Sequence, residues 1–280
     1  MPSSYYKNLT SGIDYYKFLK KLIQNFDSER EALIEKLYDI YNVIFKSHLT
    51  LSVSGSSVDE KFELKADNEL INEKKNIWSN SKVEIPNINK LAVIIPTDVN
   101  YCAEVFDARL NNSKVSGIDI CTSKIISLDY LWNEVRVKNG AYGAGMLVSM
   151  QGTYKYYSYR DPKTAETFAN FENSPKWLRS KKLTQRELDN YIISCVAKID
   201  APLPSRIIID YLDNCNFSNI EFDSRKISRS EAINTSINDI KEASEKITLL
   251  LNSANKCIFG GKDIEKLKSD GFTCINLFDN

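Results

Sequence analysis

Histidine is almost absent from this chain of 280 residues, which contains a single copy, His48. A catalytic zinc ion usually has three protein ligands, commonly including two histidines. Neither a His-x-x-Glu-His motif nor a cluster of cysteines is present to supply them. We therefore predict that the chain binds no metal and no other cofactor of its own, and that His48 packs or caps at a helix end. Serine and cysteine nucleophiles also lack a suitable base, so no catalytic residue is expected in this chain.

The chain also lacks a surplus of charge of either sign. Lys+Arg and Asp+Glu each total 37, and no long block of one sign occurs. This balance argues against nucleic acid or an anionic membrane surface as the main partner. There is no run of about 18 apolar residues that could cross a bilayer, and the N-terminus lacks the apolar core of a signal peptide. We expect no membrane association.

Cysteine is present but not in metal-binding or redox motifs. The six cysteines are scattered, without a Cys-x-x-Cys pair. In a chain of this length they are typical of buried free thiols in a reducing compartment. This predicts an intracellular location, in the cytoplasm or in an organelle.

The first 85 or so residues supply helices but no complete sheet. Residues 13–46 repeat apolar side chains at helical spacing, which predicts two helices separated at Asp27 and Ser28. A strand is expected at residues 49–54, followed by a polar linker with a short helix near 59–70. We place the domain boundary near Pro86.

From residue 86 onward, short apolar segments in pairs are separated by longer helical patterns. Strands are predicted at residues 91–96, 101–106, 145–150, 154–159, 257–259 and 272–277. Residues 118–126 fit either a helix or a strand, and Gln151-Gly152 resembles a two-residue hairpin turn. Because paired strands with long helices between them are typical of such domains, we predict an α+β fold whose sheet is largely antiparallel and packed against helices.

Several helix ends in this block carry recognisable signals. Ser127 is expected to begin a helix that ends at Asn139-Gly140. Asp161-Pro162, Thr184-x-x-Glu187 and Ser228-x-x-Glu231 are expected to begin three more helices, the last two through capping boxes. A short helix is expected at residues 263–268.

The stretch with the most chemical character runs Arg136-Val-Lys-Asn-Gly140-Ala-Tyr142-Gly143-Ala-Gly145. It leads from a helix into a strand, whereas a phosphate cradle needs the opposite polarity. Phe259-Gly-Gly-Lys262 has that polarity but lacks the rest of a P-loop, so neither segment favours a nucleotide site.

Arg136 and Tyr142 admit two interpretations. In the first, Arg136 pairs with a carboxylate at the helix end, where a cation is favoured, and Tyr142 simply packs. In the second, both side chains donate hydrogen bonds to a peptide carbonyl group, and Gly140 and Gly143 leave room for an extended substrate backbone. Donors placed where negative charge develops can each contribute a few kcal/mol to catalysis.

Around these residues the sequence resembles the C-terminal half of pitrilysin/insulinase-type zinc metallopeptidases, in the presequence-protease and falcilysin branch. The resemblance rests on three segments: Ser127-Leu-Asp-Tyr-Leu-Trp132-Asn-Glu-Val-Arg136-Val-Lys-Asn-Gly-Ala-Tyr142-Gly143, Tyr157-Ser-Tyr-Arg160-Asp161-Pro162, and Ser11-Gly12-Ile-Asp-Tyr15-Tyr-Lys-Phe18-Leu. Similarity extends over essentially the whole chain.

The resemblance implies a division of labour between two halves of a longer enzyme. Members of that family consist of four homologous α+β domains that close around a chamber, and the first domain carries the zinc site. The fourth contributes an Arg and a Tyr that bind the substrate backbone, and these match Arg136 and Tyr142 here. Residues 1–85 would then be the C-terminal part of the third domain plus a linker, and residues 86–280 the fourth domain. Asn139 stands where Gly is expected, and Asn also tolerates a left-handed helix end.

The expected function is therefore that of a substrate-binding, chamber-closing part of a zinc metalloendopeptidase that degrades unfolded oligopeptides. The zinc and the catalytic glutamate would lie in an N-terminal half, either in the same polypeptide or in a partner chain. An alternative is a non-catalytic scaffold or peptide-binding subunit of the same fold. The sequence upstream of Met1 distinguishes the two.

Overall fold

The computed structural model describes residues 2–46, 88–217, 220–221 and 223–278, and it divides the chain into two compact units. One unit comprises residues 1–87 and 204–214, and the other comprises residues 88–203 and 215–280. His48, the strand expected at residues 49–54 and the linker with its short helix lie outside the described residues.

The first unit begins with three helices, α1 (Pro2–Ser11), α2 (Ile13–Gln24) and α3 (Phe26–Lys46). The break between α2 and α3 falls at Asn25, slightly before the predicted position at Asp27 and Ser28. The reason is that the Asn25 carbonyl group accepts hydrogen bonds from the Ser28 backbone N–H at 3.1 Å and the Glu29 backbone N–H at 3.0 Å. Ser28 therefore already belongs to the first turn of α3.

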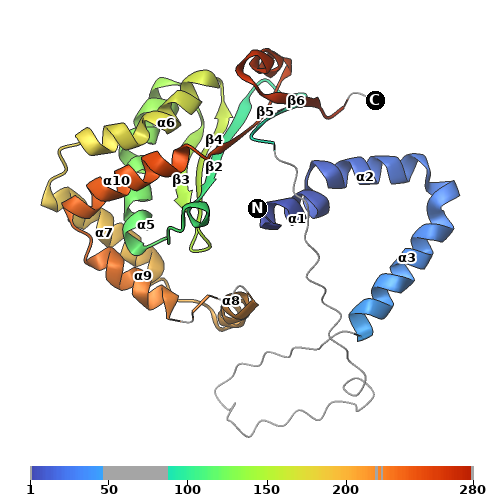
Figure 1. Cartoon of the computed structure of the whole chain (residues 1–280), viewed down its shortest axis with the longest axis horizontal. Coiled ribbons are helices and arrows are strands. Elements are labelled where there is room, and N and C mark those ends of the chain that lie inside the picture. The colour runs from blue at the N-terminus through green and yellow to red at the C-terminus, as the bar shows by residue number, and fades with distance from the viewer. Residues whose placement is uncertain (1, 47–87, 218–219, 222, 279–280) are drawn as a thin grey trace, which may run out of the picture. The chain divides into compact units, whose positions relative to one another are not determined.

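The second unit is built on a six-stranded sheet with the order β3-β4-β2-β5-β1-β6 (Figure 1). The strands are β1 (Lys90–Ile94), β2 (Asn100–Asp107), β3 (Gly143–Val148), β4 (Thr153–Asp161), β5 (Asn255–Gly260) and β6 (Thr273–Asn276). The β3–β4, β4–β2 and β2–β5 pairs are antiparallel, and the β5–β1 and β1–β6 pairs are parallel. The predicted α+β class and the largely antiparallel sheet are confirmed.

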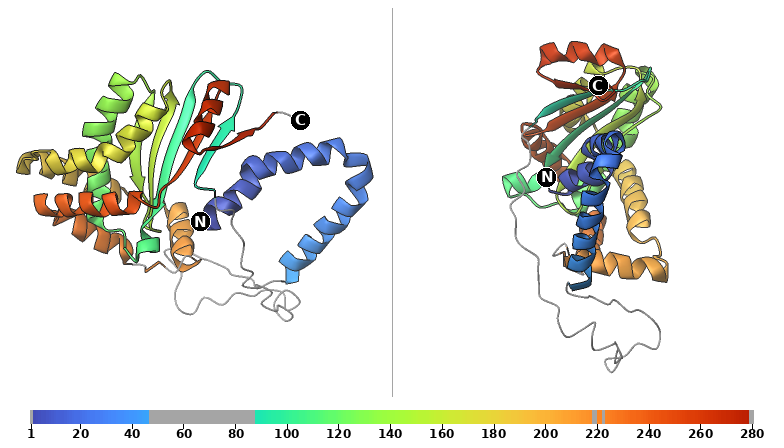
Figure 2. Two further views of the ribbon diagram at one scale, coloured as in Figure 1. Left: turned by 45° about the horizontal axis from the view of Figure 1, so that its top comes forward. Right: turned by 90° about the vertical axis from the view of Figure 1, so that its right-hand side faces the viewer.

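Helices lie on one face of this sheet (Figure 2). The helices of this unit are α5 (Gly117–Ile125), η2 (Ile126–Lys138), α6 (Ala165–Ser180), α7 (Gln185–Ile199), α9 (Ser224–Ile233) and α10 (Ile237–Leu251). Two 3₁₀ helices, η1 (Ala108–Asn111) and η3 (Lys262–Asp270), also belong to it, whereas most of α8 (Ser205–Phe217) belongs to the first unit. Residues 118–126, which the sequence left open, are thus helical. Neither α1 nor α8 was predicted.

Aromatic side chains fill the space between the sheet and its helices. The ring of Phe106 on β2 stacks on that of Tyr154 on β4, with 5.2 Å between centroids. Tyr156, two residues further along β4, stacks on Phe171 of α6 at 5.3 Å. Since alternate residues of a strand share a face, this burial directs Tyr157 and Tyr159 to the opposite face of the sheet.

The predicted helix signals are partly confirmed. Thr184 and Glu187 form a capping box at the start of α7. Ser228 and Glu231 do not form one, because both lie inside α9. The boxes that the sequence analysis missed are Ser116/Asp119 at α5 and Ser236/Asp239 at α10, in which aspartate replaces the usual glutamate.

Ser127 and Asp161 hold positions other than the expected helix starts. Ser127 lies within a continuous α5–η2 helix, and its hydroxyl accepts a hydrogen bond at 2.8 Å from the Met146 backbone N–H on the edge strand β3. Asp161 ends β4 and accepts hydrogen bonds from the Lys163 backbone N–H at 2.8 Å and the Thr167 hydroxyl at 2.7 Å. The helix that follows therefore begins at Ala165.

The hairpin between β3 and β4 has a three-residue loop in place of the expected two-residue turn. Ser149 N–H donates to the Thr153 carbonyl at 2.8 Å, and Gly152 N–H donates to the Ser149 carbonyl at 2.9 Å. Gly152 has φ +95°, a left-handed conformation that glycine adopts without strain. Three-residue hairpin loops commonly end with a glycine in this conformation.

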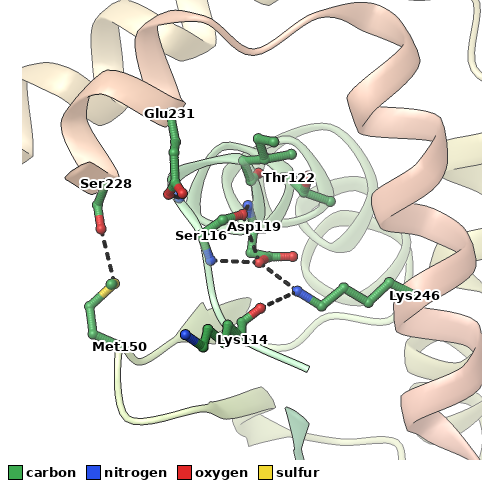
Figure 3. Close-up of polar contacts among 10 residues, drawn as sticks. Lys114, Ser116, Asp119, Thr122, Met150, Ser228, Glu231 and Lys246 are labelled. Atoms are coloured by element: carbon green, nitrogen blue, oxygen red, sulfur yellow. Dashed lines mark hydrogen bonds and ion pairs between the residues drawn. The ribbon is translucent and has the colours of Figure 1, made fainter. Parts of the chain in front are cut away.

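The N-terminus of α5 is tied to two other helices (Figure 3). Asp119, which is 2% exposed, accepts hydrogen bonds from the Ser116 N–H at 2.8 Å and from the Lys246 ammonium of α10 at 2.8 Å. Glu231 of α9 accepts one from the Gly117 N–H at 2.7 Å. The Glu231 carboxylate therefore satisfies an N-terminal amide of α5, a different helix from its own.

The buried carboxyl of Glu104 makes stability depend on pH. Glu104 on β2 is 1% exposed, and its Oε2 atom has no hydrogen-bond partner. Burial raises its pKa from 4.5 to about 7, although Lys256, with Nζ at 3.7 Å, opposes the shift. The carboxylate of Glu172 forms an ion pair with the same Lys256 ammonium group.

We expect the fold to be more stable when Glu104 is protonated. Because its folded pKa lies above the unfolded value, the free energy of unfolding is highest below the unfolded pKa and falls as pH rises through about 7. The loss approaches roughly 3 kcal/mol at 1.36 kcal/mol per pKa unit, and Lys256 and solvent relaxation reduce it. Urea titrations of the wild type and Glu104→Gln at several pH values test this. Parallel pH profiles for the two proteins would contradict it.

Candidate functional site

Arg136 lies near the end of η2, a π-helix that continues α5 without a break. π-helical segments are rare and frequent at functional sites. The buried side chain of Val135 holds this turn against the core. Arg136 itself points away from the core, and its guanidinium carbon lies 3.7 Å from the centroid of the Trp132 ring, one turn earlier. This is the geometry of a cation–π contact.

The guanidinium of Arg136 has no ion-pair partner among the residues that the structure describes. The nearby Glu134 pairs instead with Lys138, at 2.7 Å. The first interpretation of Arg136, a surface ion pair at the helix end, is therefore not seen within the described ranges. Stacking on Trp132 leaves the N–H groups at the edge of the guanidinium plane available for an acceptor.

A tight turn connects Arg136 to Tyr142. Gly140 N–H donates to the Arg136 carbonyl at 3.1 Å, and Ala141 N–H donates to the Val135 carbonyl at 3.2 Å. Gly140 has φ +84°, whereas Asn139 is right-handed with φ −89°. The expectation that Asn139 adopts the left-handed conformation is wrong, because Gly140 takes that position. Gly140 thereby fixes the direction in which the chain leaves η2.

Tyr142 immediately precedes the edge strand β3, and its side chain is 69% exposed. Its backbone N–H donates to the Tyr159 carbonyl on β4 at 3.0 Å, which anchors the main chain while the ring remains accessible. The ring meets that of Tyr159 edge-on, with centroids 5.8 Å apart. The phenol group is thus held on a rigid element and faces solvent.

Tyr142 is the outer end of a row of aromatic rings that the sequence analysis missed. Tyr159 also meets Tyr101 of β2 edge-on at 5.3 Å. Arg160, with φ +49°, follows Tyr159 and places its guanidinium carbon 5.8 Å from the same ring. Alternation along 153–161 could have indicated that Tyr159 shares the face opposite the helices.

The two glycines at the start of β3 have different surroundings. A Cβ atom added at Gly143 would meet no other atom within 4 Å. One added at Gly145 would lie 2.9 Å from the Tyr157 hydroxyl oxygen. The backbone is therefore accessible at Gly143, next to Tyr142, and covered at Gly145. Arg136 and Tyr142 each carry a hydrogen-bond donor at one end of the turn through Gly140, and the main chain that follows the turn is open at Gly143.

Two classes of feature are absent from the described ranges. No group of three or more His, Cys, Asp or Glu side chains in them could hold a metal ion. No helix in them has the length and apolar character needed to span a bilayer.

Comparison with known proteins identifies the family. The family model described as "PreP C-terminal domain" matches residues 90–259. The chain therefore belongs to the PreP C-terminal domain family, which confirms the expected resemblance to the presequence-protease branch. Arg136, Tyr142 and Gly143 all lie within the matched residues.

Named relatives agree with this assignment. The chain is 29% identical to protein HypA of Clostridium perfringens, with 96% of this chain and 28% of that protein aligned. It is 27% identical to the mitochondrial presequence protease of Drosophila melanogaster, over 85% of this chain and 23% of the relative. The chain thus spans about a quarter of the length of these relatives.

Solved structures show the same fold. Pitrilysin superposes with a TM-score of 0.52 at 10% identity, covering 75% of this chain and 24% of that one. A protease from Helicobacter pylori gives a TM-score of 0.50 at 11% identity, covering 69% of this chain and 50% of the other. The chain therefore shares its fold with part of pitrilysin and part of the Helicobacter pylori protease.

Proposed function

We propose that this chain is the substrate-binding, chamber-closing C-terminal part of a zinc metalloendopeptidase that degrades unfolded oligopeptides. The carrying observation is that Arg136, free of carboxylate partners within the described ranges, and the exposed Tyr142 stand at the two ends of one tight turn, which leads into the open backbone of Gly143. In this proposal both side chains donate hydrogen bonds to a substrate carbonyl, whose oxygen gains negative charge when the peptide is attacked.

The zinc ion and the catalytic glutamate belong, in this proposal, to an N-terminal half in the same polypeptide or in a partner chain. Family membership and the named presequence proteases support it. The exposed apolar side chains along α2 and α3, including Phe18, Ile34 and Leu37, suit a segment that packs against further protein. An intracellular, reducing location fits the free cysteines.

Zinc titration and peptide hydrolysis test this division of labour. Residues 1–280 alone should bind no stoichiometric zinc tightly and should leave an unfolded peptide intact. Addition of the zinc-bearing half should restore hydrolysis, and omission of either half should abolish it. Tight stoichiometric zinc binding by residues 1–280 alone would place the metal site in this chain and overturn the proposal.

The second candidate is a scaffold or peptide-binding subunit without a catalytic partner. Reading the frame upstream of Met1 separates the two functions. A His-x-x-Glu-His motif there would make this chain the second half of an enzyme. Its absence, together with peptide binding that no partner converts into hydrolysis, would favour the binding subunit.

A further inference from the structure

A groove with a volume of about 320 Å³ follows the outer edge of the sheet in the second unit. One wall is the edge strand β3, from Ala144 to Val148, and the other is formed by α5, η2 and α7. Ala144 comes directly after Gly143, where the main chain is open. The groove therefore begins where the turn between Arg136 and Tyr142 ends.

The helical wall contributes about one side chain per turn to the groove. Lys124, Leu128 and Trp132 all line it, and their four-residue spacing places them on one face of the continuous α5–η2 helix. Arg136, the next residue at this spacing, stacks on Trp132 at 3.7 Å. The groove is therefore continuous with the Arg136 guanidinium at one end, and Lys124 lies at the other.

The edge of β3 turns backbone groups toward the helical wall. The Met146 N–H points away from β4, because it donates to the Ser127 hydroxyl at 2.8 Å. Alternate residues of an antiparallel strand direct their backbone groups to the same side, so those of Ala144 and Val148 also point away from β4. Ser127 already bonds Met146, which leaves contacts for an extended chain at the two ends of the groove. At about 3.3 Å per residue, this wall has room for a segment of about five residues.

The middle of the groove is apolar. Leu128, Trp132 and Leu147 line it, and all three side chains are exposed. Contiguous exposed apolar side chains mark sites where other molecules bind. A peptide that extends from the turn into the groove would bury these three side chains under its own.

The end of the groove away from Arg136 carries two lysines. Lys124 of α5 and Lys198 of α7 line the groove, and no carboxylate does. Tyr191 of α7 bonds Asp129 of η2, so Lys198, about two turns later, lies toward Lys124. Neither lysine forms an ion pair within the described ranges. This end is therefore electropositive and suits a carboxylate.

We propose that the groove binds the C-terminal segment of the peptide substrate, and that Lys124 and Lys198 hold the terminal α-carboxylate. The inference rests on the proposed function, since the peptide is the one whose carbonyl group Arg136 and Tyr142 bind. The terminal carboxylate is chosen over an acidic side chain because unfolded peptides of varied sequence all carry it. The length of the β3 wall then sets the distance from the bound carbonyl to the end of the peptide.

Two peptides that differ only at the C-terminus test this on the full chain. Both are N-acetylated, unstructured decapeptides of Gly, Ser and Leu; one ends in a free carboxylate and the other in an amide. Isothermal titration calorimetry with residues 1–280 should show about tenfold tighter binding of the free acid, because the amide loses the charge-assisted contacts to the lysines. A third peptide, amidated and with Glu next to its end, tests whether a side-chain carboxylate can substitute.

The double variant Lys124→Gln/Lys198→Gln should bind the free acid and the amide with equal affinity, near that of the wild type for the amide. Lys138→Gln is the matched control, since Lys138 lies on the same helix, pairs with Glu134 and does not line the groove. The proposal is overturned if the wild type binds the free acid and the amide alike or binds neither, or if the double variant keeps the preference. Equal binding of the Glu-containing amide and the free acid would also overturn the assignment to the terminal carboxylate.

Hydrolysis by the complete peptidase distinguishes failure of this inference from failure of the proposed function. Cleavage of the free acid should fall about five residues from the C-terminus, and the double lysine variant should raise KM without lowering kcat. If Arg136→Ala leaves turnover unchanged, the proposed donor role fails, whereas the binding preference of the groove is still measured by calorimetry. If turnover requires Arg136 but neither KM nor the cleavage position depends on the peptide's C-terminus, the groove assignment alone fails.

Discussion

Arg136→Ala in the complete peptidase is expected to lower kcat/KM for an unfolded peptide by about 100-fold, since one donor to a developing oxyanion contributes roughly 3 kcal/mol. The loss should appear in kcat if the hydrogen bond strengthens as the carbonyl is attacked. Arg136→Lys should recover little of it, because a single ammonium cannot reproduce the planar fork that stacks on Trp132.

The same reasoning applies to Tyr142. Tyr142→Phe removes only the hydroxyl donor and retains the ring contact with Tyr159. Because its side chain is 69% exposed, the substitution should leave the melting temperature unchanged while turnover falls. Lys138→Ala is the matched control for Arg136, since Lys138 lies in the same turn and pairs with Glu134. Unchanged turnover in both Arg136→Ala and Tyr142→Phe would refute the proposed roles.

Gly117→Ala is expected to destabilise the second unit by about 3 kcal/mol, near the upper end of the usual cost of overpacking. A Cβ atom at this position would lie 2.0 Å from the Ser228 carbonyl oxygen and 2.5 Å from the Ala232 backbone nitrogen. Both are main-chain atoms of α9, so no side chain can move aside. The helices would have to separate, which would weaken the hydrogen bond from Gly117 N–H to Glu231.

Gly143→Ala is the control, because its Cβ atom would meet nothing within 4 Å. Urea denaturation of both variants should show a large fall in the free energy of unfolding for Gly117→Ala and almost none for Gly143→Ala. In the complete peptidase, Gly143→Ala should still lower turnover if a substrate backbone approaches there. Equal stability of the two variants would show that α9 adjusts to the added methyl group.

Local patterns were sufficient for much of the fold. The strands at residues 91–96 and 101–106, the capping box at Thr184 and the helix end at Gly140 could be predicted because each depends on residues close in sequence. Ser228 and Glu231 show where this reasoning fails. They have the spacing of a capping box, but the Glu231 carboxylate binds the N-terminus of α5, more than one hundred residues away.

The candidate site likewise contains residues that local sequence was sufficient to predict and residues that depend on the tertiary fold. Arg136 and Tyr142 were identifiable because they are close together in the chain and lie in a motif that resembles a known family. The aromatic row through Tyr101 and Tyr159 could not be found in this way, since it depends on which strands are neighbours and in which register.

The sequence by itself therefore determined the fold class, the family resemblance, the lack of a histidine-based zinc motif and the two candidate donors. These follow from residue types and short spacings, which the chain carries in any conformation. Only the tertiary structure decided that Arg136 stacks on Trp132 without a carboxylate partner in the described ranges, and that the main chain is open at Gly143 but covered at Gly145. Exposure and partner choice are set by packing between distant segments, and local sequence does not encode them.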